Sequence, residues 1–106
     1  PRELAAGEAG GEERLSPAQI ERGIDTVWNG VQRCLVLAPP DRPAAGKVIA
    51  TVEIAPDGRV TGVHLKGPNV LVQGEVGGCL RRTLRSIRFA SFDGPPMTAR
   101  YPMTFE

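Results

Sequence analysis

The most reactive side chains of this chain belong to two cysteines, Cys34 and Cys79, and to its single histidine, His64. A thiol beside an imidazole can act as a nucleophile activated by a base. However, the cysteine spacing fits no Cys-x-x-Cys redox or zinc motif, and one histidine cannot complete a tetrahedral site with two cysteines. Both cysteines also fall on the apolar faces of predicted helices, which favours buried sulfur over catalysis. We therefore expect no enzyme, no cofactor and no metal.

A second group of residues with recognisable chemistry is a basic cluster of four arginines, Arg81, Arg82, Arg85 and Arg88. Such a cluster can bind nucleic acid or anionic lipid, dock on an acidic partner, or form a solvated helix face. Clustered exposed aromatic residues that could stack on bases are not expected, and the acidic residues 1–15 would oppose phosphate binding. We favour the solvated face, expect no nucleic acid partner, and keep the cluster as a possible docking patch.

A helix predicted over residues 16–35 must position the first cysteine. Ser16 can cap its N-terminus, Pro17 suits the first helical position, and Gln19 completes a capping box. Leu15 stands where a hydrophobic staple residue would. Apolar side chains then recur at steps of three and four, which is typical of one helix face; they are Ile20, Ile24, Val27, Val31 and Cys34/Leu35.

A hairpin follows the first helix. Residues 47–55 alternate between apolar and polar side chains, which predicts a half-buried strand. Pro56-Asp57-Gly58 supplies the turn, and residues 59–66 form the return strand. The alternation places Val63 and Leu65 on one face of that strand, and Val60, Gly62 and His64 on the other.

The C-terminal part of the chain predicts a loop over residues 67–74, a second helix over 75–89 and a last strand over 97–106. The helix has an apolar face and an arginine face. The strand alternates cleanly, with five residues expected to point inward and five outward. The inward set is Met97, Ala99, Tyr101, Met103 and Phe105; the outward set is Thr98, Arg100, Pro102, Thr104 and Glu106.

These elements predict an α+β two-layer sandwich in the order α-β-β-α-β. Its three-stranded antiparallel sheet has strand order 2-1-3 and is covered on one face by two helices. The sheet then has two edges, residues 59–66 and 97–106. Pro102 supports this order, because a proline within a strand is tolerated mainly at an edge.

The same arrangement brings both cysteines onto the helix layer. If the two helices pack side by side, a Cys34–Cys79 disulfide is plausible and would be worth about 4 kcal/mol on the chain-entropy model. The alternative is two free, buried cysteines that act as small apolar side chains.

The length of 106 residues suits one domain. Residues 1–15 are rich in Gly, Ala and Glu and predict a flexible acidic tether, which leaves residues 16–106 as the folded domain. Because the chain starts at Pro1, we interpret it as an excised piece of a longer protein. No run of about 18 apolar residues predicts a membrane span.

The pattern "GKVIATVEIAPDGRV", then "GGCLRRTLRSIRF", then "RYPMTF", resembles the TonB C-terminal domain family. The resemblance is closer to the variant at the C-terminus of adventurous-gliding motility proteins. It covers about residues 16–106 and includes the placement of Cys34 and Cys79. The resemblance implies a periplasmic domain that is anchored to the inner membrane by an upstream segment. Its implied partners are outer-membrane or periplasmic proteins of a trans-envelope complex.

The resemblance also implies a mechanism, β-augmentation, in which a partner segment joins the last strand as an additional strand. Carried over, the binding strand is residues 97–106, with Thr98, Arg100, Thr104 and Glu106 as its contact residues. Two features depart from TonB proper. No Tyr-Pro motif precedes the first strand, which puts a transporter ligand in doubt, and Pro102 removes one donor from the edge.

Two other classes of protein stay open at this point. A basic nucleic-acid-binding module in the cytoplasm would have reduced cysteines and binding that weakens steeply with salt. A scaffold domain that associates with itself through the same edge would form a homodimer and need no foreign strand.

Overall fold

The computed structural model describes residues 13–106 and has the predicted α+β architecture. Helices α1 (Pro17–Asp25) and α2 (Trp28–Cys34) lead through a 3-10 turn, η1 (Leu35–Leu37), into the hairpin β2 (Gly46–Ile54) and β3 (Val60–Lys66). Helices α3 (Asn69–Val72) and α4 (Gly74–Arg85) precede the last strand β4 (Met97–Phe105). The predicted tether lies mostly in residues 1–12, outside the described residues.

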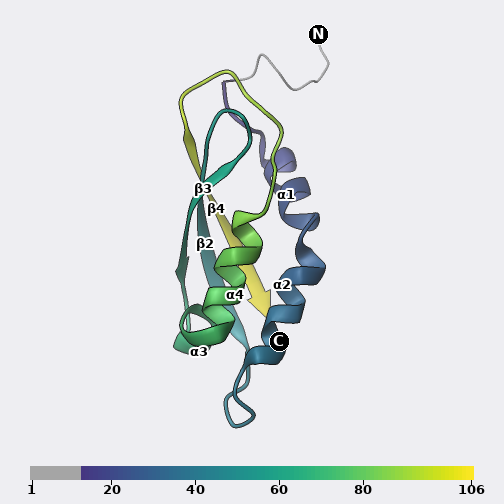
Figure 1. Ribbon diagram of the computed structural model, residues 1–106, viewed down its shortest axis with the longest axis vertical. Helices are drawn as coiled ribbons and strands as arrows, with labels where there is room; N and C mark the ends of the chain where they lie inside the picture. Colours follow the sequence, from purple (N-terminus) through teal and green to yellow (C-terminus); the bar gives the residue numbers. More distant parts are fainter. Residues whose placement is uncertain (1–12) are drawn as a thin grey trace.

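The three strands form one antiparallel sheet in the order β3-β2-β4, and the helices form a single layer over it (Figure 1). The central strand β2 buries Val48, Ala50, Val52 and Ile54 against the helices. Helix α4 packs over β3 and beside α2. The predicted fold class and strand order are therefore confirmed.

The N-terminal capping box forms as predicted. The Ser16 hydroxyl accepts a hydrogen bond from the Gln19 amide at 3.2 Å, and the Gln19 side chain accepts one from the Ser16 amide at 2.8 Å. Leu15 is only 4% exposed and serves as the staple residue. Leu15 is thus part of the core, although the sequence pattern assigned it to the tether.

The continuous helix predicted over residues 16–35 is wrong in one respect, because it breaks between Asp25 and Trp28. The Thr26 hydroxyl donates to the Gly23 carbonyl at 2.6 Å, and Val27 leaves helical geometry with φ −116° and ψ 11°. A Thr side chain that bonds back to the preceding turn competes with the helix ladder. After the break, the Trp28 ring at the start of α2 stacks on the Phe105 ring of β4, with 6.0 Å between the ring centroids.

The predicted faces of the return strand are also wrong at one residue. Ile54 pairs with Val60 and Glu53 with Gly62, so Thr61 is an extra residue in a β-bulge. The bulge shifts the alternation by one residue. As a result Val60 is buried on the helix side with Val63 and Leu65, rather than beside His64.

The C-terminal helix is shorter than predicted. It ends at Arg85, and the short helix α3 occupies part of the region predicted as a loop. Beyond α4, the chain turns back to the hairpin: Arg88 bridges to Arg59, and the Phe89 amide donates to the Gly58 carbonyl at 2.9 Å. Phe89 and Phe92 are buried there and complete the core.

Candidate partner-binding edge

The two edges of the sheet differ in how much of their backbone is covered. On the β3 side, residues 88 and 89 pair with residues 58 and 59, just before the strand, and Arg85 Nη2 donates to the Thr61 carbonyl at 3.2 Å. The bulge at Thr61 further disturbs this edge. Bulges and covering side chains are ordinary means of blocking the edge of a sheet. The β3 edge is therefore protected at its first residues.

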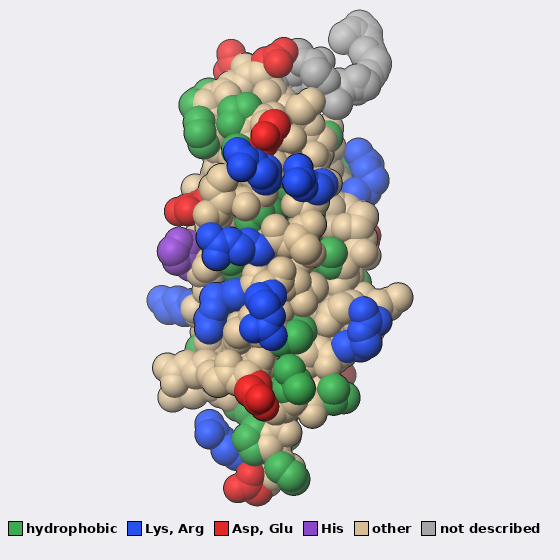
Figure 2. Space-filling view, viewed as in Figure 1, with side chains coloured by type: hydrophobic (Ala, Val, Ile, Leu, Met, Phe, Trp, Pro, Cys, Tyr) green, Lys and Arg blue, Asp and Glu red, His purple; other side chains and the backbone are tan. Residues whose placement is uncertain are grey.

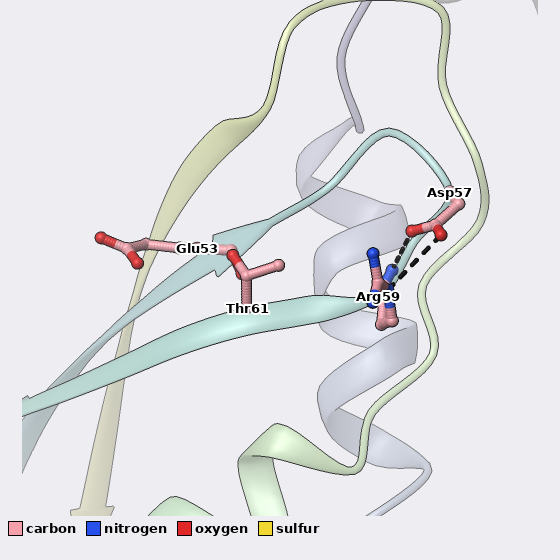
Figure 3. Close-up of polar contacts among 4 residues, drawn as sticks. All are labelled: Glu53, Asp57, Arg59 and Thr61. Atoms are coloured by element: carbon pink, nitrogen blue, oxygen red, sulfur yellow. Dashed lines mark hydrogen bonds and ion pairs between the residues drawn. The ribbon is translucent and has the colours of Figure 1, made fainter.

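Figure 3 shows the end of the hairpin where this protection begins. Asp57 Oδ1 accepts the Arg59 amide at 3.0 Å, and its Oδ2 lies 3.4 Å from Arg59 Nε. The hydrogen bond from the Arg59 amide is the main reason that the pKa of Asp57 lies below its ordinary value. On the adjoining bulge, the Thr61 hydroxyl donates to the Glu53 carbonyl at 3.3 Å. These contacts fix the turn and the bulge together.

The β4 edge is different. All nine residues of β4 pair with β2 in unbroken register, from Ile54↔Met97 to Gly46↔Phe105. Within the part of the chain that the structure describes, no strand pairs with the other side of β4. A long strand with an unpaired row of backbone groups is a template for another strand.

Pro102 indicates which backbone groups point outward. Proline has no N–H, and it is accommodated in a strand where that group would face away from the ladder. Because strand geometry alternates with a period of two, Thr98, Arg100 and Thr104 present their N–H and C=O groups to the same side. Three of the predicted contact residues thus belong to the outer row. Glu106 follows the last paired residue and lies outside β4.

A groove of about 580 Å³ runs beside the first half of this edge, between residues 14–21 and residues 97–101. The Leu15 amide lies 3.3 Å from Met97 Sδ and closes one end. Apolar side chains line much of the groove, and Arg14, Glu21 and Arg100 supply its charged groups. The apolar lining residues are Leu15, Pro17, Ile20, Met97, Ala99 and Tyr101.

Tyr101 reports the electrostatics of this groove. Its pKa is raised above 10.0, chiefly because partial burial disfavours the charged phenolate and secondly because Glu21 and Asp25 are negative neighbours. Tyr101 lines the groove together with Pro17, Ile20 and Glu21 of α1.

Sequence reasoning missed the groove. The alternation of residues 97–105 predicted inward side chains, but it did not show that Met97, Ala99 and Tyr101 remain only half-buried. No local signal marks the groove, because its two walls come from residues 14–21 and 97–101, far apart in the chain.

The frame behind the edge is held by the Cys34–Cys79 disulfide, which confirms the first of the two cysteine alternatives. It joins α2 to α4 with 5.6 Å between the Cα atoms. Thr83 Oγ1 lies 3.6 Å from Cys34 Sγ. His64 lies elsewhere, on the sheet face away from the helices, with Nε2 3.5 Å from Glu53 Oε2. The three residues with the most reactive side chains therefore do not meet.

The four arginines of the possible docking patch do not share one helix. Arg81, Arg82 and Arg85 belong to α4, whereas Arg88 lies beyond its end because residues 87–89 turn back to the hairpin. Two of them have structural contacts: Arg81 Nη1 donates to the Val72 carbonyl at 2.9 Å, and Arg85 bonds to Thr61. Arg82 and Arg88 are exposed.

Comparison with known proteins returns no matching family profile, no matching curated protein and no matching solved structure. Among residues 13–106, none of the helices has the length and apolar character needed to cross a membrane. The same residues contain no cluster of three or more His, Cys, Asp or Glu suited to a metal ion.

Proposed function

We propose that this domain is a non-catalytic protein-interaction module that binds its partner by β-strand addition along the outer edge of β4. The single observation that supports this proposal is the contrast between the two edges: β3 is bulged and covered at its start, whereas β4 offers nine residues in register beside an apolar groove. In β-augmentation, backbone hydrogen bonds supply affinity and alternate side chains enter pockets that supply specificity. The groove is placed to accept those side chains.

The resemblance to the TonB-type gliding-motility domain extends this proposal to a location and a role. The domain would work in the periplasm, anchored to the inner membrane by an upstream segment, and would couple an inner-membrane complex to outer-membrane or periplasmic partners. The disulfide supports this location, because disulfides persist in oxidising compartments such as the periplasm.

Strand addition is tested with one position changed in two ways. A peptide that binds the domain is first selected from a library of extended peptides, and its site is read from backbone amide chemical shifts. Arg100→Ala removes the side chain and keeps the N–H, whereas Arg100→Pro removes both. We expect roughly ten-fold weaker binding for the proline variant than for the alanine variant, because one backbone hydrogen bond is lost.

The proline is expected to fit, since Pro102 occupies a position of the same parity two residues away. Equal binding by the two variants, with both folded, contradicts strand addition on β4.

The proposed periplasmic location has its own test. Thiol alkylation of the protein taken from its native cells, with and without reductant, should modify Cys34 and Cys79 only after reduction.

A second candidate function, self-association through the same edge, is favoured by the same open ladder. It predicts a dimer whose fraction rises with concentration and whose formation Arg100→Pro weakens. Sedimentation velocity across a dilution series distinguishes the two functions, because only self-association produces a dimer without a foreign strand. The two functions exclude each other in one molecule, since a foreign strand and a second copy compete for β4.

A further inference from the structure

A second exposed surface lies on the helix layer, away from the β4 edge. It consists of five arginines, of which Arg81 is half-buried and the others are exposed, and we refer to it as the arginine face: Arg59, Arg81, Arg82, Arg85 and Arg88. Figure 2 shows Lys and Arg side chains gathered along the middle of this side of the molecule, over α4. The only acid within α4 is Glu75 in its first turn. At the hairpin end of the face, Asp57 Oδ2 lies 3.4 Å from Arg59 Nε, so Arg59 already has one carboxylate partner.

The fold brings these residues together from two separate segments. Arg81, Arg82 and Arg85 come from the last part of α4, and the Arg59↔Arg88 bridge adds one residue from just before β3 and one from beyond the helix. Arg81 and Arg85 lie one turn apart, about 6 Å along the helix axis. The charges therefore form a row along the helix rather than a scattered surface.

Three of the five guanidinium groups already have a partner within the domain: Arg59 pairs with the Asp57 carboxylate, and two others bond to backbone carbonyls. Arg81 uses one donor on the Val72 carbonyl, and Arg85 uses one on the Thr61 carbonyl. A guanidinium has five N–H donors, so each retains others for a ligand. Fixing a long side chain before binding reduces the entropy that a ligand contact must overcome. These two arginines are thus pre-organised.

The choice of arginine narrows the ligand class. The planar guanidinium matches a carboxylate or phosphate in a two-bond geometry that lysine cannot make. Both lysines of the chain, Lys47 and Lys66, lie instead on β2 and β3, where the register directs them to the sheet face opposite the helices. The basic groups on the helix side are therefore guanidinium groups, which suit a ligand that presents two oxygen acceptors, such as a carboxylate.

The surroundings favour a protein ligand over a membrane or nucleic acid. Within residues 13–106 the exposed large apolar side chains are Val36 and Leu37, which lie on η1 and not on the arginine face. Phe89 and Phe92 are buried beneath it. The face therefore lacks the apolar side chains that insert into a membrane surface and the aromatic rings that stack on bases.

We propose that the arginine face binds an acidic segment of a partner protein, with carboxylates spaced by about one helical turn. This site is separate from β4 and does not depend on strand addition. Because the arginine face belongs to the helix layer and the β4 edge to the sheet, both can be occupied in the same molecule.

The test uses two double variants that lose the same net charge from opposite sides of the molecule. Arg82→Gln with Arg88→Gln acts on the arginine face, and Lys47→Gln with Lys66→Gln is the matched control. The probe is a fluorescent twelve-residue peptide of alternating Glu and Ala, and its Gln counterpart reports binding without charge. Vesicles of phosphatidylglycerol are the second ligand. Thermal unfolding checks that each variant is folded.

We expect the acidic peptide to bind the unchanged protein and to dissociate as salt rises. The arginine variant should bind about five- to ten-fold more weakly, and the lysine variant less than about two-fold more weakly. Equal weakening in both variants would mean that only net charge matters and would overturn the proposal. Failure of the acidic peptide to bind at low salt, or vesicle binding with the same arginine dependence and tighter than the peptide, would also overturn it.

Discussion

Tyr101 is the only tyrosine of the chain, and its ring lines the groove beside β4. Its raised pKa gives a pH dependence with a definite sign. Folding favours the protonated phenol, so the contribution of Tyr101 to stability is complete below its ordinary pKa of 10.0 and is lost as pH rises through the higher folded pKa. Alkaline conditions should therefore destabilise the domain.

Ultraviolet absorbance of the phenolate checks this prediction without interference from other tyrosines. We expect the midpoint to lie above 10.0 in the free domain and to rise further when a peptide occupies β4, because added burial disfavours the charge. A midpoint at or below the ordinary value would place the ring in open solvent. Glu21→Gln should lower the midpoint slightly, since one negative neighbour is removed.

Gly58 has a conformational role in the hairpin turn. It has a φ of +89°, and a side chain at this position would collide with the backbone carbonyl of Phe89. Gly58→Ala should lower the free energy of unfolding by about 2–4 kcal/mol, because strain and displacement of residues 88–89 add together. Chemical denaturation measures the change.

Gly74 provides the matched control for this substitution. Its φ is also positive, at +64°, but a Cβ there would meet no atom within 4 Å. Gly74→Ala should therefore cost only the backbone term, about 1 kcal/mol. Equal costs at the two glycines would show that the packing of residues 88–89 on the turn contributes little.

At the scale of elements, the disulfide joins helices α2 and α4, which pack side by side over the sheet. Its cysteines are 45 residues apart, so the chain-entropy model gives a contribution of about 4 kcal/mol. The variant with both Cys34→Ala and Cys79→Ala should unfold at a correspondingly lower denaturant concentration. Reduction of the unchanged protein should produce a similar loss, and a loss below about 1 kcal/mol would contradict the model.

The elements also show what the sequence could predict. The capping box at Ser16 and the strict alternation of residues 97–105 depend on neighbours in the chain, so local pattern rules found them. The bulge at Thr61 and the end of α4 at Arg85 depend on contacts with distant residues: Arg85 bonds to Thr61, and Arg88 bridges to Arg59. Tertiary contacts of this kind override local periodicity.

The features of the candidate site were likewise predicted only in part. The edge position of β4 followed from Pro102 and the element order, whereas the helix faces made the disulfide plausible without excluding two free, buried cysteines. The groove could not be predicted, because its two walls come from segments far apart in the chain: Leu15 and Met97, which meet at one end, are 82 residues apart. The protection of the β3 edge was equally hidden from sequence.

At the scale of the whole molecule, one substitution tests whether Pro102 limits association. Pro102→Thr restores an N–H donor in the outer row of β4 without changing the apolar face. We expect this variant to form dimers at roughly ten- to thirty-fold lower concentration, because each copy in a symmetric dimer contributes one further backbone hydrogen bond. Sedimentation velocity measures the midpoint, which is the protein concentration at which half of the chains are dimeric. Pro43→Thr, in the exposed loop before β2, is the control and should leave the midpoint unchanged.

Strand β4 runs along the long axis of the domain, and the chain enters the fold at Leu15, beside the start of that strand (Figure 1). A force transmitted from the entering chain to a partner strand on β4 would therefore act parallel to both strands. Interstrand hydrogen bonds lie perpendicular to the strands, so this direction loads them in shear, and they must break together rather than one after another. A short bound segment could then resist tension well beyond what its equilibrium affinity suggests.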